Sequence, residues 1–267
     1  SSLTAQETYH LSYPSGAFTT IGGDVSYVGT AYTFGIKEPT FQLWIWGSES
    51  GSSDDSNGSL GLNQEGDSVN YSSPVQLPGT TWSYVGGTGF ASGVIRSDGT
   101  LWMMGSNEKG TLGQNDRTYR SSPTQVPGTT WSKIVSGFSR GTAAIKTDGT
   151  LWTWGENAQS YGGGMLGHND RISKSSPTQV PGTTWSAFDP YMGNMMLATK
   201  TDGTLWSWGY GEKGALGHNQ AGPIQLSSPT QIPGTNWGTS PDKITVTAAA
   251  SAFAIKTNGE LWGWRTN

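Results

Sequence analysis

One stretch of the sequence decides the fold: Thr142-Ala143-Ala144-Ile145-Lys146-Thr147-Asp148-Gly149-Thr150-Leu151-Trp152-Thr153-Trp154-Gly155. Two short strand-like runs flank the Asp-Gly pair. Such a pair suits a two-residue hairpin turn, because both central positions of a type I′ turn need a positive φ. The alternation of the two tryptophans places both rings on one face of the second run. The stretch therefore predicts a β-hairpin.

The hairpin recurs along the chain, and its spacing defines a repeat. Its Leu-Trp element occurs five times, beginning at Leu43, Leu101, Leu151, Leu205 and Leu261, with separations of 58, 50, 54 and 56 residues. The turn pair recurs as Asp98-Gly99, Asp202-Gly203 and Asn258-Gly259. All 13 tryptophans fall on three positions of the repeat. Bulky rings at repeating positions indicate packing rather than chemistry.

Each repeat contains four strand-like segments. In the third repeat they cover residues 130–135, 142–146, 151–154 and 175–182. The last segment, Ser-Ser-Pro-Thr-Gln-Val-Pro-Gly, contains two prolines, which cannot donate to a β-ladder and therefore favour the outer edge of a sheet. A meander of four strands in about 50 residues is typical of a propeller blade.

The sequence therefore predicts an all-β, five-bladed β-propeller of four-stranded antiparallel blades. We expect a single domain over residues 1–267, with repeats at about 17–79, 80–128, 129–182, 183–234, and 235–267 together with 1–16. The last repeat stops after its third strand, and residues 9–18 resemble the Pro-Gly-Thr-Thr-Trp segment, with Phe18 in the place of the tryptophan. The N-terminal strand is thus expected to complete the last blade and remove the open edge.

Composition excludes several classes of protein. The 267 residues include 40 glycines, 13 prolines and no cysteine, and only 13% are charged, against about 25% in an average protein. A net charge of −4 gives no basic surface for nucleic acid. No apolar run approaches the ~20 residues of a membrane span, and the first residues lack a signal-peptide pattern. We expect neither a nucleic-acid partner nor membrane insertion.

The repeats are similar to those of the regulator of chromosome condensation family. The resemblance lies in Gly-x-x-x-x-x-Ala-Ala-Ile-Lys-Thr-Asp-Gly-Thr-Leu-Trp-Thr-Trp-Gly-Glu-Asn over residues 137–157, followed by Leu166-Gly167, and it extends from about Gly22 to the end of the chain. It implies a propeller of four-stranded blades. The founding member has seven blades and exchanges nucleotide on a small GTPase at chromatin, so a GTPase regulator is one alternative. The Leu-Gly-His-Asn motif also resembles the repeats of proteins that marine bacteria and their phages encode.

No set of residues in the sequence predicts catalysis. Ser139 lies in a Gly-x-Ser-x-Gly match at residues 137–141, but that motif needs a strand-to-helix turn and here falls between two strands. His168 and His218 occupy a repeat position that Leu62 and Gln114 fill elsewhere. Such a position predicts an exposed loop site rather than a metal ligand, since structural zinc needs four converging ligands. We expect no catalytic residue, no metal and no cofactor.

The long loops between the third and fourth strands are the candidate binding elements. They cover residues 47–72, 105–120, 155–174 and 209–226, and all four are expected on the same face of the ring. Each carries one tyrosine: Tyr71, Tyr119, Tyr161 and Tyr210. Aromatic rings among Ser, Asn and Gly make adaptable contact surfaces. The alternative is that each ring packs on the Leu-Gly pair of its own loop.

These observations predict a non-enzymatic structural or interaction module. The leading hypothesis is a surface component of a phage virion, a decoration or fibre-associated protein, whose loops bind a neighbouring protein or a host glycan. Its place would then be the virion or an extracellular surface. One alternative is a multivalent lectin, which predicts the same pocket in every blade. The other is a small-GTPase regulator, which predicts one large non-repetitive patch.

Overall fold

The computed structural model describes residues 8–11, 32–35, 41–48, 58–64, 70–88, 91–138, 141–159, 162–191, 195–211, 214–220, 222–247 and 251–264. Contacts divide the chain into two compact units, Ser1–Phe41 and Gln42–Asn267. In the first unit, strands β1 (Thr8–Leu11) and β2 (Tyr32–Gly35) pair in antiparallel fashion. The repeats fall in the second unit. A single propeller domain over the whole chain stays a prediction.

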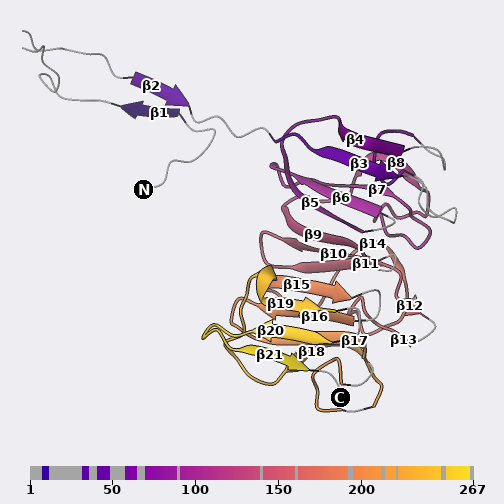
Figure 1. Cartoon of the computed structure of the whole chain (residues 1–267), viewed down its shortest axis with the longest axis vertical. Coiled ribbons are helices and arrows are strands. Elements are labelled where there is room, and N and C mark those ends of the chain that lie inside the picture. Colours follow the sequence, from indigo (N-terminus) through magenta and orange to yellow (C-terminus); the bar gives the residue numbers. More distant parts are fainter. Residues whose placement is uncertain are drawn as a thin grey trace, which may run out of the picture. The chain divides into compact units, whose positions relative to one another are not determined.

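Three sheets of the second unit have four strands each, in the order of the chain (Figure 1). The first contains β5 (Trp82–Thr88), β6 (Ala91–Arg96), β7 (Leu101–Gly105) and β8 (Arg120–Gln125). The second contains β9 (Trp131–Phe138), β10 (Gly141–Lys146), β11 (Leu151–Gly155) and β14 (Lys174–Gln179). The third contains β15 (Trp185–Tyr191), β16 (Met195–Lys200), β17 (Leu205–Gly211) and β18 (Ile224–Ile232). These sheets confirm the predicted antiparallel meander.

Two further sheets contain the first and last repeats. Strands β3 (Trp44–Ser48) and β4 (Asn70–Gln76) form one, and β19 (Ile244–Val246), β20 (Ala252–Ile255) and β21 (Leu261–Trp264) form the other. A small hairpin of β12 (Ala158–Gln159) and β13 (Gly162–Gly163) lies in one loop, and a 3₁₀ turn spans Pro241–Lys243. The unit therefore has one principal sheet for each of the five predicted repeats, and its strands are antiparallel throughout the described pairs.

The structure pairs the N-terminal strand differently from the prediction. Strand β1 pairs with β2, so that Tyr9 lies opposite Phe34, whereas β21 pairs with β20. Residues 12–18 of the predicted closing segment lie outside the described residues. Leu261 on β21 is 67% exposed, while Leu151, which a fourth strand covers, is fully buried. Closure of the ring by the N-terminal strand is thus not confirmed, because the described strand pairs join β1 to β2 and β21 to β20, and none joins β1 to β21.

Tryptophans pack against one another in the same way from repeat to repeat. The ring of Trp131 contacts Trp152 and Trp154 edge-on, with centroids 6.0 Å apart in both pairs, and Lys146 Nζ lies 4.4 Å from the Trp152 ring. The same arrangement recurs with Trp185, Trp206, Trp208 and Lys200, and with Trp237, Trp262, Trp264 and Lys256. Edge-on aromatic pairs and cation–π contacts both stabilise such clusters.

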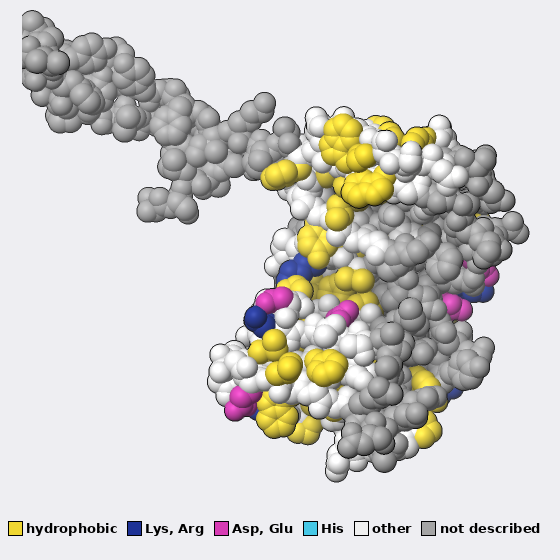
Figure 2. All heavy atoms as spheres, in the orientation of Figure 1, with side chains coloured by type: hydrophobic (Ala, Val, Ile, Leu, Met, Phe, Trp, Pro, Cys, Tyr) yellow, Lys and Arg dark blue, Asp and Glu magenta, His cyan; other side chains and the backbone are white. Residues whose placement is uncertain are grey.

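Two tryptophans depart from the predicted packing role: Trp44 and Trp46, in the sheet of β3 and β4, are 48% and 63% exposed. Trp262, in the sheet of β19 to β21, is 48% exposed although it packs edge-on against Trp237. Both sheets have fewer described strands than the others, so fewer neighbours cover these rings. In Figure 2, hydrophobic side chains reach the surface over the sheet of β3 and β4, and the charged side chains that are drawn are few and scattered.

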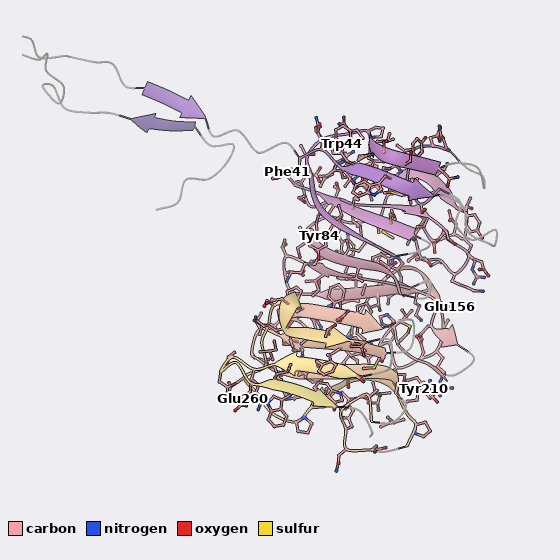
Figure 3. All side chains as sticks on the ribbon, in the orientation of Figure 1. Phe41, Trp44, Tyr84, Glu156, Tyr210 and Glu260 are labelled. Carbon is pink, nitrogen blue, oxygen red and sulfur yellow. The ribbon has the colours of Figure 1, made fainter. Side chains whose placement is uncertain are left out.

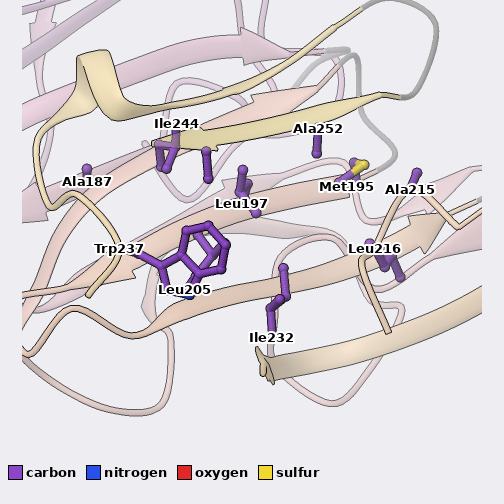
Figure 4. Close-up of a cluster of buried hydrophobic side chains, with 11 residues drawn as sticks. Ala187, Met195, Leu197, Leu205, Ala215, Leu216, Ile232, Trp237, Ile244 and Ala252 are labelled. Atoms are coloured by element: carbon purple, nitrogen blue, oxygen red, sulfur yellow. The ribbon is translucent and has the colours of Figure 1, made fainter. Parts of the chain in front are cut away.

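Neighbouring sheets share one hydrophobic core. Figure 4 shows such a cluster, in which Ala187 and Leu197 from β15 and β16 pack with Ile244 and Ala252 from β19 and β20. The turn between the second and third strands joins sheets as well: Trp185 N donates to Gly149 O at 2.9 Å. Each sheet therefore depends on the next one for the burial of its apolar face.

Candidate interaction surface

The loops between the third and fourth strands dock on the next sheet along the chain. The backbone N–H of Asn63 donates to Ser121 O at 2.7 Å, that of Asn115 to Ser175 O at 2.8 Å, and that of Asn169 to Ser227 O at 2.7 Å. Each acceptor lies near the start of an outer strand. Because the same contact recurs between successive sheets, these three loops emerge at one end of the sheets, as the sequence predicted.

The second tryptophan of three of the four Trp-x-Trp pairs fixes the preceding loop. Indole Nε1 of Trp154 donates to Thr111 O at 2.7 Å, that of Trp208 to Met165 O at 2.8 Å, and that of Trp264 to Ala215 O at 2.8 Å. Gly113, two residues after Thr111, has a φ of +69°, and a Cβ there would lie 2.9 Å from the Trp154 Nε1. The Leu-Gly pair therefore needs its glycine both for conformation and for space.

A buried asparagine organises each of two adjacent loops. The side-chain oxygen of Asn107 accepts from Leu112 N at 2.8 Å, and its Nδ2 donates to Asp116 Oδ1 at 2.9 Å. Asn157 makes the same bonds to Leu166 N at 3.0 Å and to Asp170 Oδ1 at 3.2 Å. Both amides are fully buried, and their satisfied hydrogen bonds hold the loop backbone in one conformation. Sequence reasoning missed this role, although Gly-x-Asn recurs after both third strands.

Two ion pairs also stabilise these loops. Arg120 Nη2 lies 2.6 Å from Asp116 Oδ2, and Lys174 Nζ lies 2.8 Å from Asp170 Oδ2. These pairs are partly exposed, so each contributes little to stability by itself. Because Arg120 and Lys174 are paired within the protein, neither presents an unpaired positive charge to a partner.

The two loop histidines point inward, and the prediction of an exposed position is wrong. His168 Nε2 lies 2.9 Å from Thr153 Oγ1, and His218 Nε2 lies 3.0 Å from Ser207 Oγ. Both side chains are half-buried, and desolvation by burial lowers the pKa of each histidine. The Thr153 hydroxyl already donates to Leu166 O at 2.6 Å, so the His168 tautomer that fits is the one donating from Nε2. Among the described residues, no cluster of three His, Cys, Asp or Glu side chains is placed to hold a metal.

The predicted tyrosines lie in different settings. Tyr71 donates its hydroxyl to Gln64 Oε1 at 2.5 Å, and Tyr210 is half-buried on β17, opposite Gln225. Figure 3 shows Tyr210 and Glu156 at one end of the sheets and Glu260, in a turn between second and third strands, at the other. Tyr161 lies outside the described residues. A binding role for these tyrosines stays a prediction.

Tyr119 is the candidate that lines a cavity. The cavity has a volume of about 550 Å³ and is bordered by Glu108, Lys109, Arg117, Thr118 and Tyr119. In the adjacent loop of the following repeat, Ile172 is 65% exposed. Charged, aromatic and aliphatic side chains thus lie on two neighbouring loops, and the buried Asn107 and Asn157 hold the backbones of these loops in place.

The Gly-x-Ser-x-Gly match does not form a nucleophile elbow. Gly137 lies in β9 and Gly141 in β10, which pair with each other as antiparallel strands, and Ser139 lies outside the described residues. An elbow needs a strand followed by a helix.

The described residues also contain no helix that is long and apolar enough to cross a bilayer.

Comparison with known families agrees with this geometry. The profile of the Regulator of chromosome condensation (RCC1) repeat matches residues 98–141 and 202–252. Each match begins at an Asp-Gly turn and takes in the third strand, the docking loop and the outer strand of a sheet. Two segments of the chain therefore match the RCC1 repeat. No curated protein sequence matches it.

Three solved structures have a similar fold. Yeast RCC1 (Prp20), solved bound to Kap60, is 15% identical with a TM-score of 0.64, over 84% of this chain and 52% of that one. Human WBSCR16 is 19% identical with a TM-score of 0.60, over 90% and 58%. Prp20p from Saccharomyces cerevisiae is 16% identical with a TM-score of 0.55, over 73% and 48%. The chain thus spans about half the length of these proteins, and the likeness establishes the fold.

Proposed function

We propose that this chain is a non-enzymatic interaction module that binds a protein partner through the loops between its third and fourth strands. The observation that carries the proposal is the loop at residues 106–119. Its backbone is fixed by the buried Asn107, yet Lys109, Arg117 and Tyr119 stand around a cavity at its surface. A binding loop that is already ordered loses less conformational entropy when a partner binds.

The similar solved structures support a protein as the partner. Yeast RCC1 was solved bound to Kap60, and Prp20p is described with its binding to Gsp1p and histones. These partners belong to those proteins, and we carry over only their class. The same structures favour a small-GTPase regulator as the second candidate. A lectin with one site per blade is less favoured, because Tyr71, Tyr119 and Tyr210 lie in different surroundings. Placement on a phage particle or cell surface stays a prediction.

Affinity capture with surface variants tests the proposal. The tagged full chain is incubated with lysate of the organism that encodes it, and retained proteins are quantified by mass spectrometry. We expect one stoichiometric protein partner with the wild type. We expect its loss with a Tyr119→Ser, Ile172→Ser double variant, which alters two neighbouring loops. The control is Thr183→Arg, an exposed position at the opposite end of the sheets, which is expected to retain the partner.

The opposite pattern contradicts the proposal. Loss of the partner with Thr183→Arg and its retention with the loop variant would move the interface to the turns between the second and third strands. Recovery of a small GTPase that prefers its nucleotide-free form would establish the regulator instead. Circular dichroism of all three proteins checks that each is folded.

A further inference from the structure

We propose that the cavity beside Tyr119 binds a carboxylate side chain in an acidic segment of the partner protein. This proposal rests on the interaction function proposed above and names the chemistry that the partner presents. The cavity is a depression that is widely open to solvent, with a volume of about 550 Å³, so it can receive a side chain that a partner presents on its surface. Glu108, Lys109 and Arg117 bring charged groups to its lining, so the state of each charge decides what it binds.

Most charges around the cavity are already neutralised. Lys109 Nζ lies 2.8 Å from Glu108 Oε1, and Arg120, next to Tyr119, is paired with Asp116. Arg117 is exposed and makes neither a hydrogen bond nor an ion pair within the described part of the chain. One guanidinium therefore supplies the net positive charge of the cavity. A single guanidinium matches one carboxylate, which it contacts through two parallel hydrogen bonds.

The next repeat shows what the same arginine does when it has an internal partner. Arg171 follows Asn169-Asp170 as Arg117 follows Asn115-Asp116. Its Nη2 donates to Oε1 of Gln225, two residues before Ser227 on the following sheet. The residue that corresponds to Gln225 for Arg117 is Ser173, two residues before Ser175. Ser173 is shorter, and its hydroxyl accepts a hydrogen bond from Asn157 N at 3.1 Å. Arg117 thus lacks the amide acceptor that Arg171 uses.

The backbone around Arg117 is held in place. Thr118 N donates to Asp116 Oδ1 at 2.9 Å, and Arg120 Nη1 donates to Thr118 O at 2.8 Å. These bonds fix the residue on its C-terminal side, so the start of the arginine side chain is positioned before any ligand arrives. Arg117 and Tyr119 both border the cavity.

Fluorescence anisotropy with a defined probe tests this site. The probe is a labelled peptide of alternating Glu and Gly, and its matched control is the Gln and Gly peptide. The full chain is used as wild type, Arg117→Gln and Arg171→Gln. We expect the acidic peptide to bind the wild type and to bind Arg171→Gln unchanged. We expect it to bind Arg117→Gln at least tenfold more weakly, because glutamine cannot form the two parallel charge-assisted hydrogen bonds. We expect the Gln peptide to bind all three weakly.

Several outcomes overturn the proposal. These are equal affinity of the wild type and Arg117→Gln, an equal loss with Arg171→Gln, equal binding of the two peptides, and no binding to the wild type. Binding of sialyllactose at Arg117 in place of the peptide would assign the cavity to an acidic glycan and also overturn it.

The capture experiment separates this proposal from the broader one. If Arg117→Gln retains the captured partner while the Tyr119→Ser, Ile172→Ser variant loses it, the carboxylate site is wrong and the loop interface stands. If the loop variant retains the partner, the loop interface is wrong whatever the peptide result.

Discussion

Single residues in the docking loops make stability depend on pH. Burial lowers the pKa of His168 and His218, and nearby Lys174 adds to this effect at His168 while Asp170 opposes it. The unfolded chain then binds protons more readily than the folded one. The stabilising contribution is present above the unfolded histidine pKa of about 6.5 and is lost as the pH falls through the lowered folded pKa.

We therefore expect the free energy of unfolding to decrease as the pH falls from about 7 to 5, the range in which histidines change charge. A His168→Gln, His218→Gln variant should show a smaller decrease. Glutamine is suited to the position because Gln114 occupies it in another repeat and donates to Gln125 O at 3.1 Å. Urea unfolding at several pH values measures both slopes, and identical slopes would show that these histidines do not contribute.

Backbone strain is stored at one residue of each repeat. Thr184 has a φ of +65°, and Asn236 adopts +66° at the same position in the next repeat. A β-branched residue is disfavoured in this left-handed region, which asparagine tolerates. We expect Thr184→Asn to raise the free energy of unfolding by about 1 kcal/mol. Thermal unfolding measures the change. Thr183→Asn, next to it and without a positive φ, should have little effect, and equal shifts in the two variants would contradict the explanation.

At the scale of elements, the turn between the second and third strands both closes a hairpin and supports the next sheet. Gly149 has a φ of +77°, and a Cβ there would lie 3.1 Å from Thr184 Cα. Gly259 has a φ of +88°, with nothing within 4 Å of such a Cβ. Hydrogen bonds from the Thr150 hydroxyl and backbone N–H hold the pKa of Asp148 below its usual range and fix the turn.

The two glycines form a matched pair for mutation. Each alanine variant places a Cβ at positive φ and should lose about 1–2 kcal/mol of stability. Gly149→Ala should lose roughly 1 kcal/mol more, because it also crowds the adjacent sheet. Chemical denaturation of both variants gives the difference. Equal losses would mean that the contact between turn and sheet contributes nothing.

The indole bonds that fix the loops allow a second comparison between elements. Trp208 is fully buried and donates to Met165 O, whereas the half-buried Trp206 donates to Thr204 Oγ1 within its own sheet. We expect Trp208→Phe to lower the free energy of unfolding by about 1–3 kcal/mol, because it leaves a buried carbonyl without its donor. Trp206→Phe should cost less. Hydrogen exchange at residues 164–167 should quicken only with Trp208→Phe, and no change there would contradict the role of the bond.

For the whole molecule, the sequence predicted the order of the five principal sheets because the Leu-Trp element recurs in all five repeats and an Asp-Gly or Asn-Gly turn precedes it in four of them. It did not predict the pairing of β1 with β2, since four-residue strands carry little register information. The partial burial of His168 and His218 was missed because it depends on contacts with the hydroxyls of Thr153 and Ser207, which lie on the preceding third strands. The proposed carboxylate-binding role of Arg117 could not be predicted from the sequence. It depends on comparing Ser173 with Gln225, and only the three-dimensional contacts between neighbouring sheets show that these two positions correspond.

Closure of the ring by residues 1–16 stays a prediction with a direct test. If these residues cover the outer edge of the last sheet, their deletion should lower the midpoint of thermal unfolding. Full burial of a leucine such as Leu261 contributes about 2 kcal/mol. An unchanged midpoint and unchanged tryptophan fluorescence in the truncated chain would show that the repeats of Gln42–Asn267 do not depend on the N-terminal segment.

Hydrogen exchange of the purified chain with and without its captured partner tests the central claim most directly. The claim predicts that protection on binding is concentrated in the loops between third and fourth strands, above all in peptides covering residues 106–119 and 164–173. Protection confined to the opposite turns, around residues 98–99, 148–149 and 202–203, would contradict it.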